Sequence, residues 1–175
     1  MDYDSHKQNK SRRKKHKMHG KIFQIERDPI YEDDYIDENF IPEWFVWSIA
    51  DSVETNEGSE RTEAINWLMN SALDSVAYID GDKLTFNGNI NRYFESKFSR
   101  FTEKAANLAM ASLYDFSHTE KLDSMLDELS QAYSDRFGFY VYDSTEDSIL
   151  PLDKFMRRVS PGETYYIGGV VDYHY

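Results

Sequence analysis

Cysteine is absent from the 175-residue sequence, and this excludes disulfide bonds, thiolate zinc sites and cysteine nucleophiles together. Long apolar stretches are absent as well. No run approaches the roughly 18 residues that a membrane-spanning helix needs, and the first residues lack the apolar core of a signal peptide. Apolar residues still make up 40% of the chain and aromatic residues 15%, which is enough for a hydrophobic core. We therefore expect a soluble, cytoplasmic protein with one folded domain.

Histidine is scarce where a catalytic or metal site would need it. The chain has five histidines, and three of them lie among the first 21 residues, which leaves His118 and His174. His118 comes just before an expected helix start, and His174 alternates with tyrosines at the end of the chain. Metal sites need clustered ligands, and no Ser-His-Asp set stands out. The sequence thus predicts no catalytic residue, no metal site, no cofactor and no enzymatic activity.

Two short motifs resemble ligand-binding loops but fit turns and packing better. Asp80-Gly81-Asp82 looks like the start of a calcium loop, yet a strand follows where further oxygen ligands would be required. A hairpin turn explains this motif. Gly168-Gly169 lies inside an expected strand rather than between a strand and a helix, so it indicates a bulge or close backbone packing instead of a phosphate-binding loop.

The charge of the chain is divided unevenly between two segments. The formal net charge is −12, from 20 basic and 32 acidic residues. Residues 1–21 carry eight basic and two acidic residues, a charge of +6, whereas residues 22–175 carry 12 basic and 30 acidic residues, a charge of −18. The sequence therefore predicts two parts, a basic arm over residues 1–21 and an acidic domain over residues 22–175.

The basic arm has few apolar side chains and no periodicity, so we expect it to be disordered when the protein is alone. A run of cations within it could neutralise several phosphates of RNA or DNA: Arg12, Arg13, Lys14, Lys15 and Lys17. These five residues are the candidate nucleic-acid contacts. The alternative is a solubilising tail, or one that folds back onto the acidic domain.

The domain itself reads as a single α+β unit with about five helices packed on a small antiparallel sheet. Strands are expected at 22–25, in a hairpin at 75–86, at 137–142 and at 164–173; helices are expected at 42–54, from about 58 to 72, at 90–113, at 119–133 and just after Pro151. In the long helix at 90–113, phenylalanines recur at helical spacing. We expect that apolar face, which includes Phe94, Phe98 and Phe101, to belong to the core.

An acidic, tyrosine-rich segment precedes the first expected helix, and it contains the candidate partner-binding carboxylates: Glu32, Asp33, Asp34, Asp37 and Glu38. On the helix that follows, Trp44 and Trp47 lie opposite the apolar face, and on the next expected helix Trp67 does the same, beside Glu60 and Glu63. One interpretation is that the segment is a solvated connector and that the sheet or the next segment covers the tryptophans. The other is an aromatic patch rimmed by carboxylates, which is typical of a protein-binding surface.

Two stretches of the chain, residues 41–53 and the ending formed by 137–142 with 165–175, resemble small acidic proteins carried by phages and other bacterial mobile elements. That group is similar in character to antirestriction and anti-CRISPR inhibitors. The resemblance implies an inhibitor of an RNA-guided or restriction nuclease in the bacterial cytoplasm. The charge of −18 on residues 22–175 favours a DNA mimic that occupies the basic channel of such a nuclease. The arm lies outside the resemblance, and its cations are expected to contact RNA or DNA. The alternative is a nucleic-acid-binding accessory protein of a mobile element that acts through the arm.

Overall fold

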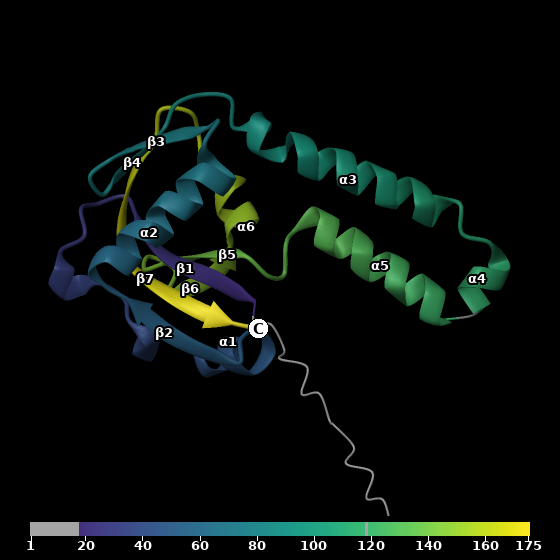
Figure 1. Cartoon of the computed structure of the whole chain (residues 1–175). Coiled ribbons are helices and arrows are strands. Elements are labelled where there is room, and N and C mark those ends of the chain that lie inside the picture. Colours follow the sequence, from purple (N-terminus) through teal and green to yellow (C-terminus); the bar gives the residue numbers. More distant parts are fainter. Residues whose placement is uncertain (1–17, 118) are drawn as a thin grey trace, which may run out of the picture.

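A computed structural model describes residues 18–117 and 119–175, and this part of the chain has an α+β fold (Figure 1). Its strands are β1 (His19–Glu26), β2 (Ser52–Asn56), β3 (Ala77–Asp80), β4 (Lys83–Phe86), β5 (Phe139–Asp143), β6 (Ser148–Pro151) and β7 (Thr164–His174). Its α-helices are α1 (Glu43–Ser48), α2 (Gly58–Leu68), α3 (Asn91–Ala109), α4 (Leu113–Ser117), α5 (Thr119–Tyr133) and α6 (Leu152–Met156). A π-helical segment, η3 (Met69–Leu73), extends α2, and two 3-10 turns, η1 (Glu32–Asp34) and η2 (Glu38–Phe40), precede α1.

The strands form one mixed sheet in the order β3-β4-β7-β1-β5-β6, with β2 pairing to the second half of β7. β7 is central because its eleven residues are mostly apolar and buried, and it pairs antiparallel with β1, β2 and β4. β1 and β5 are parallel. The prediction of a small antiparallel sheet is therefore wrong in size and in direction. Among the described residues the sheet has seven strands, and six α-helices and the π-helical segment replace the five helices expected.

The helix expected over residues 42–54 is much shorter, and its second half is a strand. α1 ends at Ser48, and β2 begins at Ser52. The amide of Asp51 donates a hydrogen bond to the carbonyl oxygen of His174 (2.7 Å), and β2 then pairs with β7 from Ser52 to Asn56. Pairing with a central strand satisfies the backbone of this stretch better than the end of an isolated helix would, so tertiary contacts override the helical pattern.

The domain begins earlier than the charge distribution indicated. Residues 19–21, assigned above to the basic arm, form the start of β1. Lys21 lies among acceptors there, because its Nζ atom is 3.2 Å from Asp172 Oδ2 and 2.8 Å from Asn56 Oδ1. The five cations proposed as nucleic-acid contacts, Arg12, Arg13, Lys14, Lys15 and Lys17, lie outside the described residues, as does His118.

Each face of the sheet has its own hydrophobic core. On one face, α2 and α6 pack against side chains that include Phe23, Leu84 and Val170. On the other, the segment from residue 31 to residue 50 packs through four buried side chains, Ile36, Ile41, Phe45 and Ala50, against strand residues that include Ile22 and Tyr173. In Figure 1, α2 and α1 accordingly lie on opposite sides of the sheet.

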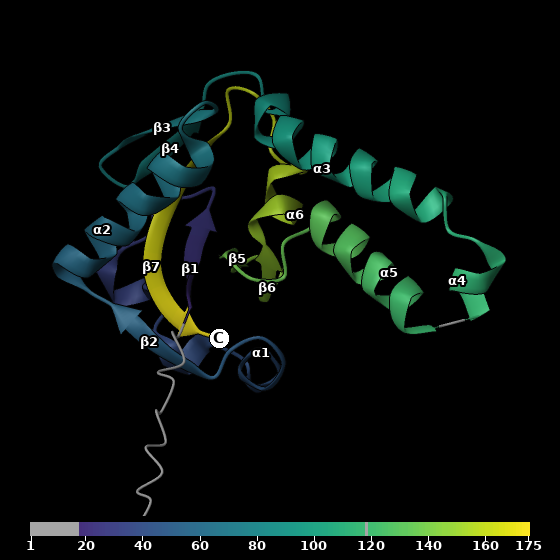
Figure 2. The same cartoon turned by 45° about the vertical axis from the view of Figure 1, so that its right-hand side comes forward.

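Helices α3 and α5 form a hairpin that extends away from the sheet (Figure 2). No residue of α3 is fully buried. Phe94 is partly buried and packs against the hydrophobic core, as expected, but the expectation that Phe98 and Phe101 belong to the core is wrong. Phe101 instead contacts Tyr133 of α5, with 6.0 Å between ring centroids, and Phe98 is 65% exposed. Most of the apolar face of α3 packs against the neighbouring helix α5. In the described structure no further element covers these two helices.

A buried carboxylate joins the base of this hairpin to the domain. Asp153, in α6, is only 3% exposed. Its Oδ1 accepts a hydrogen bond from the Tyr93 hydroxyl (2.6 Å) and lies 3.0 Å from Lys97 Nζ, while its Oδ2 accepts from the backbone N–H of Asp135 (3.0 Å). Burial and the nearby Asp153 carboxylate raise the pKa of Tyr93 far above its usual value. Asp153 thus links α3, α6 and the end of α5.

Three buried tyrosines make the stability of the domain sensitive to alkali. The hydroxyls of Tyr140, Tyr142 and Tyr165 donate to the carbonyl of Arg136, to Asp147 and to Glu163, respectively. Burial is the main cause that raises the pKa of each to about 12. In the unfolded chain a tyrosine ionises near pH 10. The unfolded state therefore loses these protons first, and the free energy of unfolding falls as the pH rises from about 10 toward 12.

We expect the melting temperature, followed by circular dichroism, to be stable up to about pH 10 and to fall steeply above it. Tyr142→Phe should flatten part of that fall because it removes one of the ionising groups. Tyr31→Phe is the matched control, since Tyr31 is 73% exposed. A melting temperature that stays constant from pH 10 to 12, or equal profiles for the Tyr142→Phe variant and the wild type, would contradict the assignment.

Candidate functional site

The segment that covers the second face of the sheet has two different sides. Ile36, Ile41 and Phe45 point into the core. On its other side the same segment exposes four aromatic side chains and a set of carboxylates. We call this outer side the acidic-aromatic face, and it consists of Tyr31, Glu32, Asp33, Asp34, Asp37, Glu38, Phe40, Glu43, Trp44 and Trp47.

Local backbone structure explains why these side chains point outward. The tight turns η1 and η2 interrupt the segment, and in η2 the Asp37 side chain accepts a hydrogen bond from the Asn39 amide (2.8 Å). The amide of Glu38 donates to Thr55 Oγ1 of β2 (3.0 Å). Pro42 then precedes the first turn of α1, where its missing N–H costs nothing. The turns keep the apolar residues on the sheet and leave the polar ones in solvent.

A buried glutamine fixes this segment to the centre of the sheet. Gln24 of β1 is 3% exposed. Its Oε1 accepts hydrogen bonds from the backbone N–H groups of Ile36 and Gly169, each at 3.0 Å, and its Nε2 donates to the carbonyl of Asp34 at 3.1 Å. The Gln24 side chain therefore connects the backbone at Asp34 and Ile36 to the backbone of β7 at Gly169.

The two glycines of β7 provide the space for this contact. A Cβ atom on Gly169 would lie 2.3 Å from the backbone oxygen of Ile36, and one on Gly168 would lie 2.4 Å from Gln24 Oε1. The pairing register of β1 with β7 also shifts between Phe23 and Ile25, opposite these glycines. The prediction that Gly168-Gly169 marks a bulge with close backbone packing is confirmed.

The structure places all seven predicted partner-binding residues on this face. Glu32, Asp33 and Asp34 form η1 and are exposed, Glu38 is exposed in η2, and Asp37 is half-buried between the two turns. Trp44 and Trp47 lie on α1 and are 53% and 85% exposed. The interpretation in which the sheet or a later segment covers these two tryptophans is therefore wrong.

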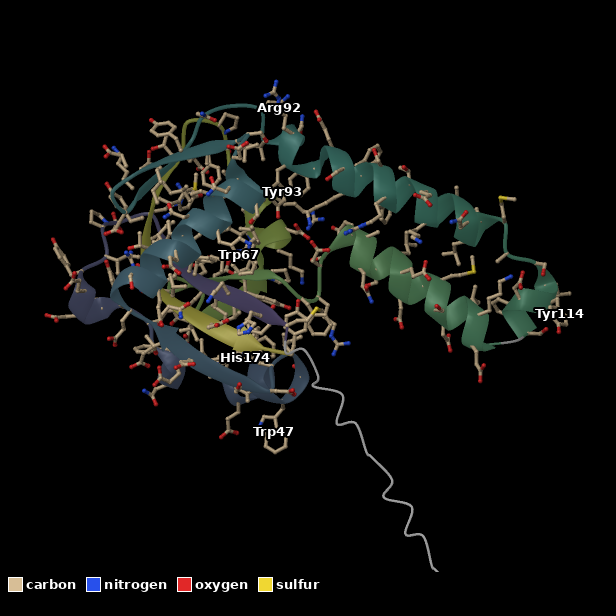
Figure 3. The ribbon with its side chains drawn as sticks, viewed as in Figure 1. Trp47, Trp67, Arg92, Tyr93, Tyr114 and His174 are labelled. Carbon is tan, nitrogen blue, oxygen red and sulfur yellow. The ribbon has the colours of Figure 1, made fainter. Side chains whose placement is uncertain are left out.

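Trp67 does not belong to the same surface. It lies on α2, on the opposite side of the sheet, and packs edge-on against Phe139 with 4.8 Å between ring centroids (Figure 3). Trp47 instead points away from the domain at α1 (Figure 3). Two further exposed aromatic residues, Tyr31 (73%) and Phe40 (55%), were not among the predicted partner-binding residues. Phe40 adjoins the buried Ile41, and no helical period distinguishes the two.

The carboxylates of the face have no cationic partner, unlike nine acidic residues elsewhere in the described domain that form ion pairs. Within residues 18–117 and 119–175, none of Glu32, Asp33, Asp34, Asp37, Glu38 and Glu43 has a lysine, arginine or histidine nitrogen within 4.0 Å. By contrast, Asp82 binds Arg61 (2.8 Å) and Glu163 binds Arg27 (2.9 Å). The face therefore presents negative charge that the described part of the protein does not neutralise.

The exposed carboxylates and aromatic rings of this face can bind a cationic partner surface. Most of the carboxylates are exposed, on the turns η1 and η2 and at the start of α1. Glu32 also lines a hollow of about 460 Å³ together with Tyr35, Arg61 and Asp82. Potential metal ligands gather elsewhere, at the paired ends of β1 and β7, where His19, Asp172 and His174 lie close together. The sequence does not reveal this cluster because its members lie at opposite ends of the chain.

Comparisons with protein-family models, with curated proteins and with solved structures find no match for this chain. Of the helices in the described structure, none combines the length and apolar character needed to cross a membrane.

Proposed function

We propose that the protein is a non-enzymatic inhibitor that binds a nucleic-acid-binding defence nuclease in the bacterial cytoplasm, of the RNA-guided or restriction type. The observation that carries the proposal is the acidic-aromatic face, in which carboxylates without cationic partners alternate with exposed aromatic rings. A nuclease channel that holds nucleic acid is lined by arginine and lysine. A surface of this composition is complementary to such a channel.

Each part of the face has a distinct role in the proposed complex. The carboxylates of Glu32, Asp33, Asp34 and Glu38 accept charge-assisted hydrogen bonds from the cations that otherwise bind phosphates. Trp44 and Trp47 provide apolar anchors, because large aromatic side chains dominate binding energy when a partner buries them. The charge of −18 on residues 22–175 adds long-range attraction to a basic partner and speeds association.

A charge-reversal pair of variants tests which surface binds. The first variant replaces Glu32, Asp33, Asp34 and Glu38 with lysine; Asp37 is kept because its side chain holds the Asn39 amide. The matched control reverses four exposed carboxylates on the helical hairpin, Glu95, Glu103, Asp123 and Asp127, so that the total charge changes equally. Binding to immobilised RNA-guided nucleases, with and without guide RNA, and to restriction nucleases is then measured.

We expect the first variant to bind at least about 30-fold more weakly than the wild type and the control variant to bind within a few-fold of it. Salt should weaken the wild-type complex, because charge pairs at a rim are screened. Equal losses in the two variants would show that only net charge matters. Unchanged binding of the first variant would exclude the face as the contact.

The basic arm supports a second function, a nucleic-acid-binding accessory protein, because residues 1–21 carry a charge of +6. Deleting residues 1–17 separates the two proposals. If nuclease binding survives the deletion while binding to bare DNA or RNA is lost, the domain is the inhibitory part and the arm is an additional nucleic-acid contact. If nuclease binding is lost as well, the arm carries the activity.

A further inference from the structure

Two histidines and an aspartate meet where the first and last strands of the domain pair. His19 of β1 lies directly opposite His174 of β7, and Lys21 lies opposite Asp172. Alternate residues of a strand point to the same face of a sheet, so this register places His19, Asp172 and His174 together. One nitrogen or oxygen atom from each lies within 4.8 Å of the corresponding atoms of the other two. Figure 3 places His174 at the C-terminal end of β7.

Two atoms of this cluster are buried without a hydrogen-bond partner in the described structure, Asp172 Oδ1 and His174 Nδ1. The other carboxylate oxygen, Asp172 Oδ2, is 3.1 Å from His19 Nδ1 and 3.2 Å from Lys21 Nζ. The rings of His19 and His174 are 4.1 Å apart between centroids. Buried polar atoms nearly always have a partner, and a single ion between these side chains would satisfy both.

The charge around the cluster favours a cation despite the adjacent Lys21. Next to it, β2 and α2 border a hollow of about 390 Å³ that is lined by Glu54, Glu60, Glu63 and Trp67 together with Lys21 and Asp172. Four carboxylates and one ammonium group therefore line this hollow. Lys21 contacts Asp172 Oδ2 and Asn56 Oδ1, which leaves Asp172 Oδ1 available as a ligand.

We propose that His19, Asp172 and His174 bind one divalent transition-metal ion. Two imidazole nitrogens and one carboxylate oxygen suit Zn²⁺, Fe²⁺, Co²⁺ or Ni²⁺ rather than Mg²⁺ or Ca²⁺, which prefer oxygen ligands alone. Metal–nitrogen and metal–oxygen bonds of about 2.0–2.2 Å require small movements of the two rings toward each other. The ion would join the first residue of β1 to the end of β7.

Calorimetric titration of the full chain with Zn²⁺ tests the site. His6 and His16 are replaced by asparagine in the parent chain and in every variant, so that residues 1–17 supply no imidazole. We expect one equivalent of Zn²⁺ to bind, and His19→Gln, Asp172→Asn and His174→Gln each to weaken binding at least tenfold. His118→Gln is the matched control and should leave the affinity unchanged. Co²⁺ should give visible absorption bands that disappear in the His174→Gln variant.

The His19→Gln variant separates loss of a zinc ligand from loss of folding, because His19 is exposed and its replacement leaves the core intact. Circular dichroism of each variant confirms that the domain is folded. The proposal is overturned if the parent chain binds no Zn²⁺ at 100-fold molar excess. It is also overturned if the folded His19→Gln and His174→Gln variants bind as tightly as the parent.

Discussion

Replacing Asp153 with alanine is expected to lower the free energy of unfolding by about 3 kcal/mol, because a buried charge network loses its acceptor. The change leaves the hydroxyl of Tyr93 and the amide of Asp135 without their partner and removes one of the two carboxylates that contact Lys97. Other attachments of the hairpin of α3 and α5 lie at its base, where Tyr93 and Phe94 pack against the core and Arg157 donates to the carbonyl of Tyr133 (2.7 Å). No residue of α3 is fully buried. The backbone amides of the hairpin of α3 and α5 should also exchange with solvent faster than those of β1 and β7.

Chemical denaturation followed by circular dichroism measures the first effect, and hydrogen exchange measures the second. Asp127→Ala is the matched control, since Asp127 is an exposed carboxylate on α5, and we expect it to change stability by less than about 0.5 kcal/mol. A loss for Asp153→Ala as small as that of the control would show that Asp153 does not anchor the hairpin.

Replacing Gln24 with alanine is expected to cost about 3–5 kcal/mol and to disorder the acidic-aromatic face. The buried N–H groups of Ile36 and Gly169 both lose their acceptor, at about 1–3 kcal/mol each, and the side chain leaves a cavity. Because the amide of Gln24 also holds the carbonyl of Asp34, the turn that carries the carboxylates loses its connection to the sheet.

We therefore expect the Gln24→Ala variant to have a lower free energy of unfolding than the wild type. We also expect it to bind the nuclease more weakly, even at temperatures where the domain remains folded. Gln131→Ala, at an exposed position on α5, is the control for both measurements. Nuclease binding that is unchanged in a folded Gln24→Ala variant would mean that the geometry of the turn does not matter for recognition.

Elements with a clear local pattern could be predicted from the sequence. The hairpin at 75–86 is present as β3 and β4, with Gly81 at a positive φ of 60° in its turn. The expected helix at 119–133 has the bounds of α5, and the strand expected at 164–173 is β7. In these segments, residue spacing and turn chemistry agree with the tertiary structure.

Features that depend on distant pairings could not be predicted. β2 adopts an extended conformation because it pairs with β7, and the parallel pairing of β1 with β5 joins residues such as Lys21 and Phe139. The phenylalanines of α3 show the same limit in another form. Helical spacing indicates that one face is apolar, but it does not show whether one helix or a whole domain packs against it.

The candidate sites also include residues that local sequence patterns could predict and residues that they could not. The exposure of the seven proposed partner-binding residues was predictable, because acidic and aromatic side chains out of phase with the apolar positions tend to face solvent. The cluster of His19, Asp172 and His174 depends on the register between the first and last strands. That register is set by the whole sheet and not by any local pattern.

Competition with nucleic acid tests the central claim most directly. A nuclease that binds this protein is loaded with a fluorescent DNA duplex, and displacement of the DNA is followed as the protein is added. The proposal predicts that the wild type and the hairpin charge-reversal control displace the DNA, and that the Glu32, Asp33, Asp34 and Glu38 reversal variant does not. A stable ternary complex in which DNA and the wild-type protein are bound together at the nuclease would contradict it.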